Sequence, residues 1–300
     1  MTVRGRFVAL SILMSTFATI GAAAQTTFRA GVDLVRVDVS VTHGGQPVRG
    51  LTAADFSIHD SGVAQRVNSV TLLDDLAVSV SIVLDTSGSV DGERLRHLID
   101  AGQGLLASLR PDDRAALITF SDRVDVQVPL TTERVAISTR LSRMTGRGAT
   151  ALHDAVWTAL ELTPQDETRP LVLVFTDGVD NASWIPRSGL VELARRTGVV
   201  IHAVELLEQP VVTARGTRVQ AQPSALDLAA EVSGGRAWSA VSSKDLRELF
   251  TRAIAEMRAR YLVTYYPEGV PKPGWHPLKI GTKGRGDITA RAGYVVPPRE

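Results

Sequence analysis

Cysteine is absent from all 300 residues, so the chain can form no disulfide bonds and has no cysteine that could carry a lipid anchor. Its charges almost cancel, at a formal net charge of +1, and no basic excess points to nucleic acid. The six histidines show no zinc-like spacing. Neither a Walker phosphate-binding loop nor a Gly-x-Ser-x-Gly nucleophile elbow occurs. Stability must therefore come from the hydrophobic core, and several common enzyme classes have no support.

One long apolar run lies at the N-terminus, over Phe7–Ile20. Arg4 and Arg6 precede it and three alanines at 22–24 follow it, which is the order of a secretory signal with an Ala-x-Ala cleavage site. The run is too short for a comfortable transmembrane helix, and an uncleaved anchor is the alternative. We expect residues 1–24 to be a signal peptide. The mature protein would begin at Gln25, have no membrane span and reside in the periplasm or outside the cell.

Two β-rich segments flank the centre of the chain. Apolar and polar residues alternate along Leu34–Thr42, as in a half-buried antiparallel strand whose polar face includes Asp38. The same alternation returns at Tyr261–Tyr265. Each segment is too small to build a core of its own. We therefore predict that residues 25–75 and 260–300 pair into one small antiparallel β-sandwich.

Residues 76–259 differ from these flanks. Apolar strands alternate with helices of 3.6-residue periodicity, which is typical of a doubly wound, mostly parallel sheet. Val124–Val128 is expected at an antiparallel edge and Gly235–Trp238 as a short strand, while the polar stretch Glu208–Pro223 interrupts the pattern without an assigned function. The predicted fold is an α/β domain with a Rossmann-like sheet, inserted in the small β-sandwich.

The central strand of this domain begins at Val78 and leads into Asp85-Thr86-Ser87-Gly88-Ser89. Open α/β sheets bind ligands beyond the carboxyl ends of their strands, so Asp85, Ser87 and Ser89 are predicted to converge in one loop. Their oxygens suit Mg²⁺, Mn²⁺ or Ca²⁺ better than zinc or copper. Gly88 permits a tight turn, and Ser89 is expected where the next helix begins.

This loop resembles the metal-ion-dependent adhesion site of von Willebrand factor type A domains, whose pattern is Asp-x-Ser-x-Ser. That site also uses a distant threonine and a distant aspartate. Here a threonine follows Gly148-Ala149, and an aspartate follows the apolar strand Leu171–Thr176. The resemblance implies a von Willebrand A-type fold holding a divalent cation, Mg²⁺ first and Mn²⁺ or Ca²⁺ next. Three hydroxyls would bind it directly and two carboxylates partly through water: Ser87, Ser89, Thr150, Asp85 and Asp177.

Nearly the whole mature chain is similar to a bacterial family of exported proteins described as von Willebrand factor A-related, known mainly from Acidobacteria. The matching stretches are 32–41, Leu51–Phe56, Asp85–Ser89, Gly148–Ala155, Phe175–Gly178, Gly234–Arg236, Tyr261–Tyr266 and Ala292–Tyr294. The resemblance implies an exported protein with a metal-dependent binding domain, and it names no partner.

The residues around the predicted site are open to two interpretations. Asp180, Asn181 and Trp184 could form a rim that touches a ligand, but we expect Trp184 to pack on its own helix. His153 lies one turn into the helix after Thr150. It is expected on the helix face rather than on the cation, because hard cations prefer oxygen.

We expect a protein-binding module for adhesion or envelope assembly, whose partner supplies an Asp or Glu carboxylate to the metal, and we do not expect an enzyme. A metal-dependent hydrolase is the alternative. Asp85-Thr86-Ser87 superficially resembles an aspartic-protease motif, but Ser87 replaces its glycine, and haloacid-dehalogenase-type phosphatases need an aspartate at that position. A structural envelope protein with a vestigial metal site is the third interpretation.

Overall fold

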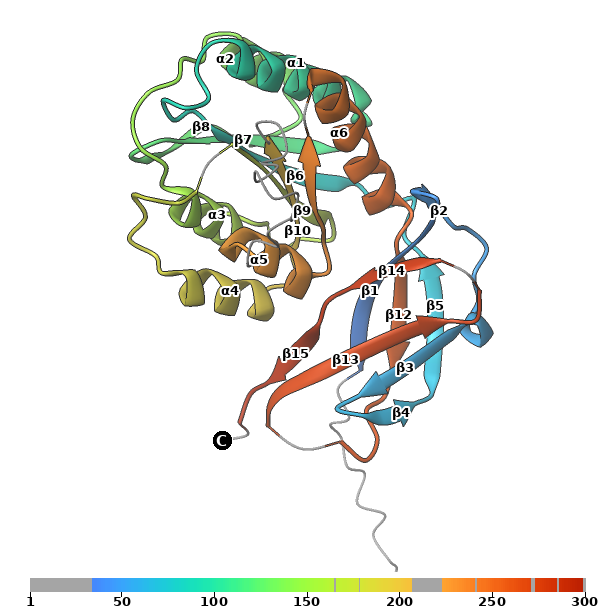
Figure 1. Ribbon diagram of the computed structural model, residues 1–300. Helices are drawn as coiled ribbons and strands as arrows, with labels where there is room; N and C mark the ends of the chain where they lie inside the picture. The colour runs from blue at the N-terminus through green and yellow to red at the C-terminus, as the bar shows by residue number, and fades with distance from the viewer. Residues whose placement is uncertain are drawn as a thin grey trace, which may run out of the picture. The chain divides into compact units, whose positions relative to one another are not determined.

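The computed structural model describes residues 34–298 apart from 165, 178, 207–222, 241, 271–272 and 285, and Asp33–Glu300 form one compact unit. The predicted signal peptide, and the stretch Glu208–Pro223 apart from Pro223 itself, lie outside the described residues. Elements far apart in the sequence build the unit, which contains a six-stranded sheet and two smaller antiparallel sheets (Figure 1).

The six-stranded sheet is parallel except at one edge. Its strand order is β11-β10-β9-β6-β7-β8, and β8 runs antiparallel to β7, as the sequence predicts for this edge. Valine, isoleucine and leucine dominate the inner strands, which are buried on both faces because helices cover them. The strands are β6 (Val78–Asp85), β7 (Arg114–Phe120), β8 (Val124–Thr131), β9 (Arg169–Thr176), β10 (Val200–Leu206) and β11 (Ala237–Ala240).

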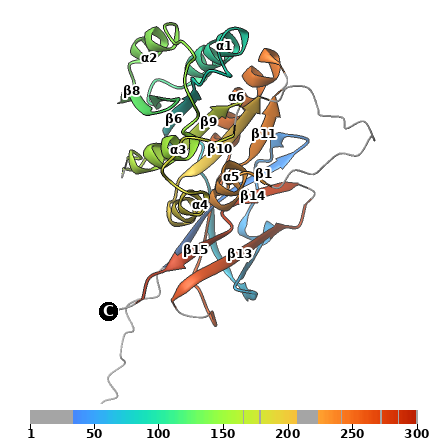
Figure 2. The same cartoon turned by 60° about the vertical axis from the view of Figure 1, so that its left-hand side comes forward.

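Helices cover both faces of this sheet, and each face has its own apolar core (Figures 1 and 2). Apolar side chains at helical spacing pack α1 and α6 onto one face, whereas small alanines let α3 and α5 approach the other. The helices are α1 (Glu93–Ser108), α2 (Arg134–Leu141), α3 (Leu152–Glu161), α4 (Arg187–Arg196), α5 (Ala225–Ser233) and α6 (Ser243–Arg258). The α/β, doubly wound fold class is confirmed.

The chain order reverses at the centre of the sheet. From β6 the chain moves outward through β7 to β8, then returns to place β9 on the other side of β6. The carboxyl ends of β6 and β9 therefore meet at the topological switch point, where open α/β sheets bind their ligands.

The two smaller sheets share the third core. One has the order β14-β1-β12-β5 with β2 on β1, the other β15-β13-β3-β4, and all their pairings are antiparallel. N-terminal and C-terminal strands alternate in the first sheet, and in the second the C-terminal pair β15-β13 joins the N-terminal pair β3-β4. The elements are β1 (Val35–His43), β2 (Gln46–Pro47), the 3₁₀ turn η1 (Ala53–Asp55), β3 (Phe56–Asp60), β4 (Val63–Gln65), β5 (Val67–Leu72), β12 (Tyr261–Tyr265), β13 (Gly274–Thr282), β14 (Asp287–Ala290) and β15 (Gly293–Val296).

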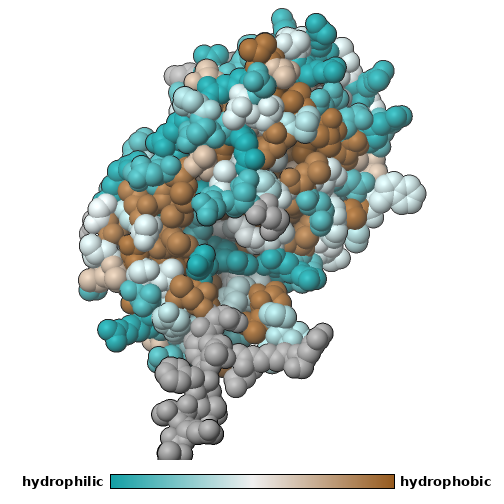
Figure 3. Space-filling view, turned by 180° about the vertical axis from the view of Figure 1, so that it is seen from behind, coloured by the Kyte–Doolittle hydropathy of each residue, from teal (hydrophilic) through white to brown (hydrophobic). Residues whose placement is uncertain are grey.

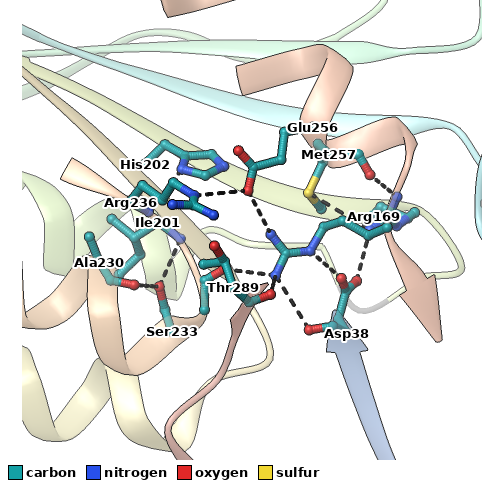
Figure 4. Close-up of polar contacts among 12 residues, drawn as sticks. Asp38, Arg169, Ile201, His202, Ala230, Ser233, Arg236, Glu256, Met257 and Thr289 are labelled. Carbon is teal, nitrogen blue, oxygen red and sulfur yellow. Dashed lines mark hydrogen bonds and ion pairs between the residues drawn. The ribbon is translucent and has the colours of Figure 1, made fainter. Parts of the chain in front are cut away.

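Buried charges join the β-sandwich to the α/β part (Figure 4). Asp38 of β1 accepts hydrogen bonds from Arg169 of β9 and from Arg260, which follows α6. Burial alone would raise the pKa of Asp38, but the positive charges of Arg260 and Arg169 outweigh it and lower that pKa. Glu256 of α6 faces Arg260 at 3.8 Å and Arg236 at 3.5 Å. The junction is thus a paired network rather than an apolar seam.

Two local predictions are wrong, for reasons of backbone geometry. Helix α1 begins at Glu93, four residues after Ser89, because residues 88–92 form turns and Gly92 takes a φ of 80°. Strand β11 begins at Ala237 instead of Gly235. Gly234 ends α5 in the left-handed conformation, at a φ of 83°, and a Cβ on Gly235 would meet the Ile201 carbonyl at 1.8 Å. These glycines therefore make the turn between helix and strand.

The surface of the molecule mixes apolar and polar residues. On the face shown in Figure 3, apolar residues form separate groups among hydrophilic ones, which is ordinary for a water-exposed surface. Among the helices of the described residues, none is long and apolar enough to cross a membrane.

Candidate metal site

Asp85 is fixed at the carboxyl end of β6 by two hydrogen bonds. The Ser87 amide donates to Oδ1 at 2.8 Å, and the Thr176 hydroxyl at the end of β9 donates to Oδ2 at 2.7 Å. The residue is fully buried. Burial raises the pKa of the Asp85 carboxyl, the nearby Asp177 carboxylate adds to the rise, and the hydrogen bonds from Ser87 and Thr176 oppose it. This carboxylate therefore gains strongly from a neighbouring positive charge.

A chain of hydroxyls leads from this loop to Asp177. The Ser89 hydroxyl donates to Oδ1 of Asp177 at 2.7 Å, and it lies 3.1 Å from the Ser87 hydroxyl. The structure thus brings together four of the five predicted ligand side chains, in two loops that follow neighbouring strands.

Thr150, the fifth, is placed through its main chain. Its amide donates to the Asn181 side-chain oxygen at 2.8 Å, and its carbonyl accepts from the Asn181 amide at 3.0 Å. Two residues earlier, the Gly148 carbonyl accepts from the Gly88 amide at 3.0 Å, which ties this segment to the loop after β6. Gly148 has a φ of +85°, a backbone conformation that favours glycine.

Two of the predicted rim residues make hydrogen bonds to main-chain amides near the start of α3, and the third, Trp184, is exposed. Asn181 positions Thr150, and Asp180 accepts from the His153 amide at 3.2 Å at the start of α3. His153 itself lies 3.0 Å from the Ile185 carbonyl through Nδ1, so its ring contacts the main chain of this loop. The expectation that Trp184 packs on its own helix is wrong. Its side chain is 93% exposed, because the loop before α4 directs it into solvent.

Arg94 is a member of the site that the sequence reasoning missed. Its Nη1 donates to Oδ2 of Asp177 at 2.7 Å and to the Ser89 carbonyl at 3.0 Å. The Asp177 side chain is 1% exposed, against 34% for Arg94. Its position could have indicated this role, because a cationic side chain stands in the first turn of α1, five residues after Ser89. The Arg94 guanidinium therefore places a positive charge directly on one of the two predicted carboxylate ligands.

The donor set favours a hard cation. Among the described residues no three His, Cys, Asp or Glu side chains gather in one place, so a zinc-type centre has no support there. The cluster after β6 instead combines two carboxylates with serine and threonine hydroxyls. Such neutral and anionic oxygens are the ligands of Mg²⁺, Mn²⁺ and Ca²⁺, and two carboxylates balance one divalent charge.

Comparisons with known proteins agree with this arrangement. Residues 80–179 match the model of the von Willebrand factor type A domain. A von Willebrand factor type A protein from Catenulispora acidiphila superposes with a TM-score of 0.53 at 12% identity, covering 88% of this chain and 74% of that chain. Proximal thread matrix protein 1 from the mussel byssus, with a zinc-occupied metal-ion-dependent adhesion site, gives 0.51 at 20% identity over 66% of this chain and 49% of that chain.

The sequence match to a curated relative is shorter. The uncharacterized protein sll0103 of Synechocystis is 32% identical over 83 residues, which are 27% of this chain and 20% of that protein. This chain thus matches only a fifth of that relative's length, and the structural likenesses, all below 25% identity, show a shared fold. The narrower resemblance to an Acidobacteria-type exported family stays a prediction. Family model, strand order and neighbouring structures agree, and the chain contains a von Willebrand factor type A domain.

Proposed function

We propose that this protein is an exported, metal-dependent protein-binding module that serves adhesion or envelope assembly. The observation that carries the proposal is the linked group Asp85, Ser87, Ser89 and Asp177 at the switch point of the sheet, with Thr150 in the adjoining segment. All are oxygen donors, and they lie where doubly wound folds bind ligands.

These five residues would hold one divalent cation, Mg²⁺ first and Mn²⁺ or Ca²⁺ next. When bound, the cation supplies an electrophilic centre with a position that a carboxylate can take. Neighbouring residues hold the ligands in position. Thr176 and the Ser87 amide hold Asp85, and Asn181 holds the main chain of Thr150. The zinc-occupied site of the mussel protein supports the view that this fold can hold a divalent ion at such loops.

The partner would be a protein that presents an Asp or Glu side chain. Mg²⁺ requires six oxygens in near-octahedral array and keeps waters wherever protein ligands are missing. An incoming carboxylate can replace one such water and add its negative charge to the site. Trp184, 93% exposed beside the Asp180–Asn181 loop, offers apolar area to the same partner.

A metal-dependent hydrolase is the competing function. A haloacid-dehalogenase-type phosphatase needs an aspartate at the position that Ser87 occupies, so this class of hydrolase has no support at the site. A broad hydrolase screen in Mg²⁺ and Mn²⁺, with Asp85→Ala as control, tests this alternative. Activity in the wild type that the variant loses would replace the binding proposal by the enzyme proposal.

The binding proposal is tested with an envelope extract of the native host. Wild-type bait in Mg²⁺ should retain a protein that chelator releases, and Thr150→Val bait should retain much less of it. Thr150→Val removes one oxygen at similar volume and keeps the main-chain contacts to Asn181. If the same proteins bind with and without chelator, recognition through the metal is wrong.

Export is tested separately. The mature protein from that host should begin near Gln25, and an intact mass that retains residues 1–24 would contradict cleavage of a signal peptide.

A further inference from the structure

A basic groove lies beside the candidate metal site. Its volume is about 640 Å³, and it runs from the loops after β6 and β7 to the C-terminal end of α2. Two residues, Thr86 and Gly148, line the groove and also belong to the loops of the site. The Arg147 amide donates to the Thr86 carbonyl at 2.8 Å, so the groove wall and the metal-site loop are one hydrogen-bonded structure.

The charge of the groove is unbalanced. Four arginines line it against two aspartates, Asp122 and Asp125, which leaves two positive charges in excess. The Ser121 hydroxyl chiefly lowers the pKa of Asp122, and Arg123 and Arg147 lower it further. The four arginines are Arg123, Arg140, Arg143 and Arg147. In the part of the chain that the structure describes, their guanidinium groups make no hydrogen bond or ion pair with another side chain.

Four arginines on one surface repel one another, although water and salt screen exposed charges, and an anion bound among them relieves that repulsion. Arginine is also the side chain whose planar donors match a carboxylate in two parallel hydrogen bonds. We propose that this groove binds an acidic segment of the partner protein, so that one carboxylate reaches the cation while its neighbours in the sequence pair with Arg140 and Arg143. The inference rests on the proposed function, because it extends the same partner beyond the metal.

A fluorescein-labelled peptide of eight glutamates serves as the probe, followed by fluorescence anisotropy in Mg²⁺ at moderate salt. Replacing both arginines at the end of α2, in Arg140→Gln/Arg143→Gln, should weaken binding about fivefold. The matched control is Arg36→Gln/Arg66→Gln, which removes two arginines of the β-sandwich that are also exposed. It should leave binding within about twofold of wild type. Asp85→Ala and chelator measure the contribution of the metal separately.

The outcomes separate the groove from the metal. Equal losses in the two double variants would mean that only total charge matters, and no loss in the groove variant would also overturn the inference. An eight-nucleotide DNA strand that binds more tightly than the peptide, with the same dependence on arginine, would replace the acidic protein by a nucleic acid. Peptide binding that depends on the arginines but not on the metal would support the groove and refute the metal-dependent function. Binding that depends on the metal but not on the arginines would refute the groove alone.

Discussion

Arg169 donates a hydrogen bond from Nη2 to Oδ2 of Asp38 at 2.8 Å, and this contact ties β9 of the α/β part to β1 of the sandwich. The Asp38 carboxylate also accepts from Arg260, whose side chain is fully buried. One carboxylate therefore pairs with two guanidinium groups that have little access to water. A strand of the sandwich is needed to satisfy charges that belong to the other part of the unit.

Asp38→Asn should lower the free energy of unfolding by about 2 kcal/mol or more, because it leaves the buried Arg169 without an anion and Arg260 with Glu256 alone. The loss should be smaller than at a fully buried pair, since the Asp38 side chain is 32% exposed. Urea denaturation measures it. Asp75→Asn, at an exposed turn, is the control and should change stability by less than about 0.5 kcal/mol. Equal effects from the two substitutions would show that the network contributes little.

His202 should make stability depend on pH. It is fully buried, its ring stacks on Trp238 at 4.6 Å, and it faces Glu256, Arg236 and Arg260. Burial lowers its pKa to about 4, so between pH about 6.5 and about 4 the unfolded chain holds a proton that the folded chain does not. The free energy of unfolding should therefore fall as pH falls through that window, by roughly 3 kcal/mol at most.

His202→Asn is the variant that isolates this effect. The Arg236 amide donates to His202 Nδ1 at 3.0 Å, and an asparagine oxygen can accept the same bond without titrating. Denaturation in chelator at several pH values should give the variant a shallower slope than the wild type between pH about 4 and 6.5. Parallel curves would mean that other groups cause the acid sensitivity.

Arg94 should oppose cation binding, because its guanidinium already faces Asp177. Arg94→Met removes that charge and keeps an extended side chain, so the variant should bind Mn²⁺ roughly threefold more tightly. Arg94→Lys keeps the charge and should stay close to wild type. Mn²⁺ titration followed by electron paramagnetic resonance gives both affinities. Weaker binding in the methionine variant would instead assign Arg94 a supporting role in the loop.

Asn181 should act on the cation without touching it, by holding the main chain of Thr150. Asn181→Ala deletes the acceptor of the Thr150 amide and should weaken Mn²⁺ binding about threefold to tenfold. Asn181→Asp restores an acceptor at the same place and should recover the affinity. Two variants with the same weak binding would indicate that the amide group of Asn181 has another role.

Much of this architecture follows from local pattern. The strand from Val78 and the helix from Glu93 have the periodicities of their classes, and Asp85 and Asp177 end apolar strands that any parallel sheet would place at one edge. The doubly wound fold class could therefore be predicted, along with the loops that meet at the switch point. The ligand roles of the five residues stay predictions.

The features that the sequence did not reveal depend on partners far along the chain. Alternation along β1 placed Asp38 on a polar face, yet Arg169 and Arg260 come to lie on it, 131 and 222 residues later. Arg94 contacts Asp177 across 83 residues. Trp184 looked like a packing residue because of its size, and only the path of its loop leaves it exposed. Local periodicity carries no information on such contacts.

The central claim is that Asp85, Ser87, Ser89, Thr150 and Asp177 hold one divalent cation, and isothermal titration of Mn²⁺ and Mg²⁺ into the full chain tests it most directly. The wild type should bind one ion per chain. Thr150→Val, which loses one oxygen and keeps its main-chain hydrogen bonds, should bind at least about tenfold more weakly with an unchanged melting temperature in chelator. Absence of binding in the wild type, or equal affinity in the two proteins, would contradict the account.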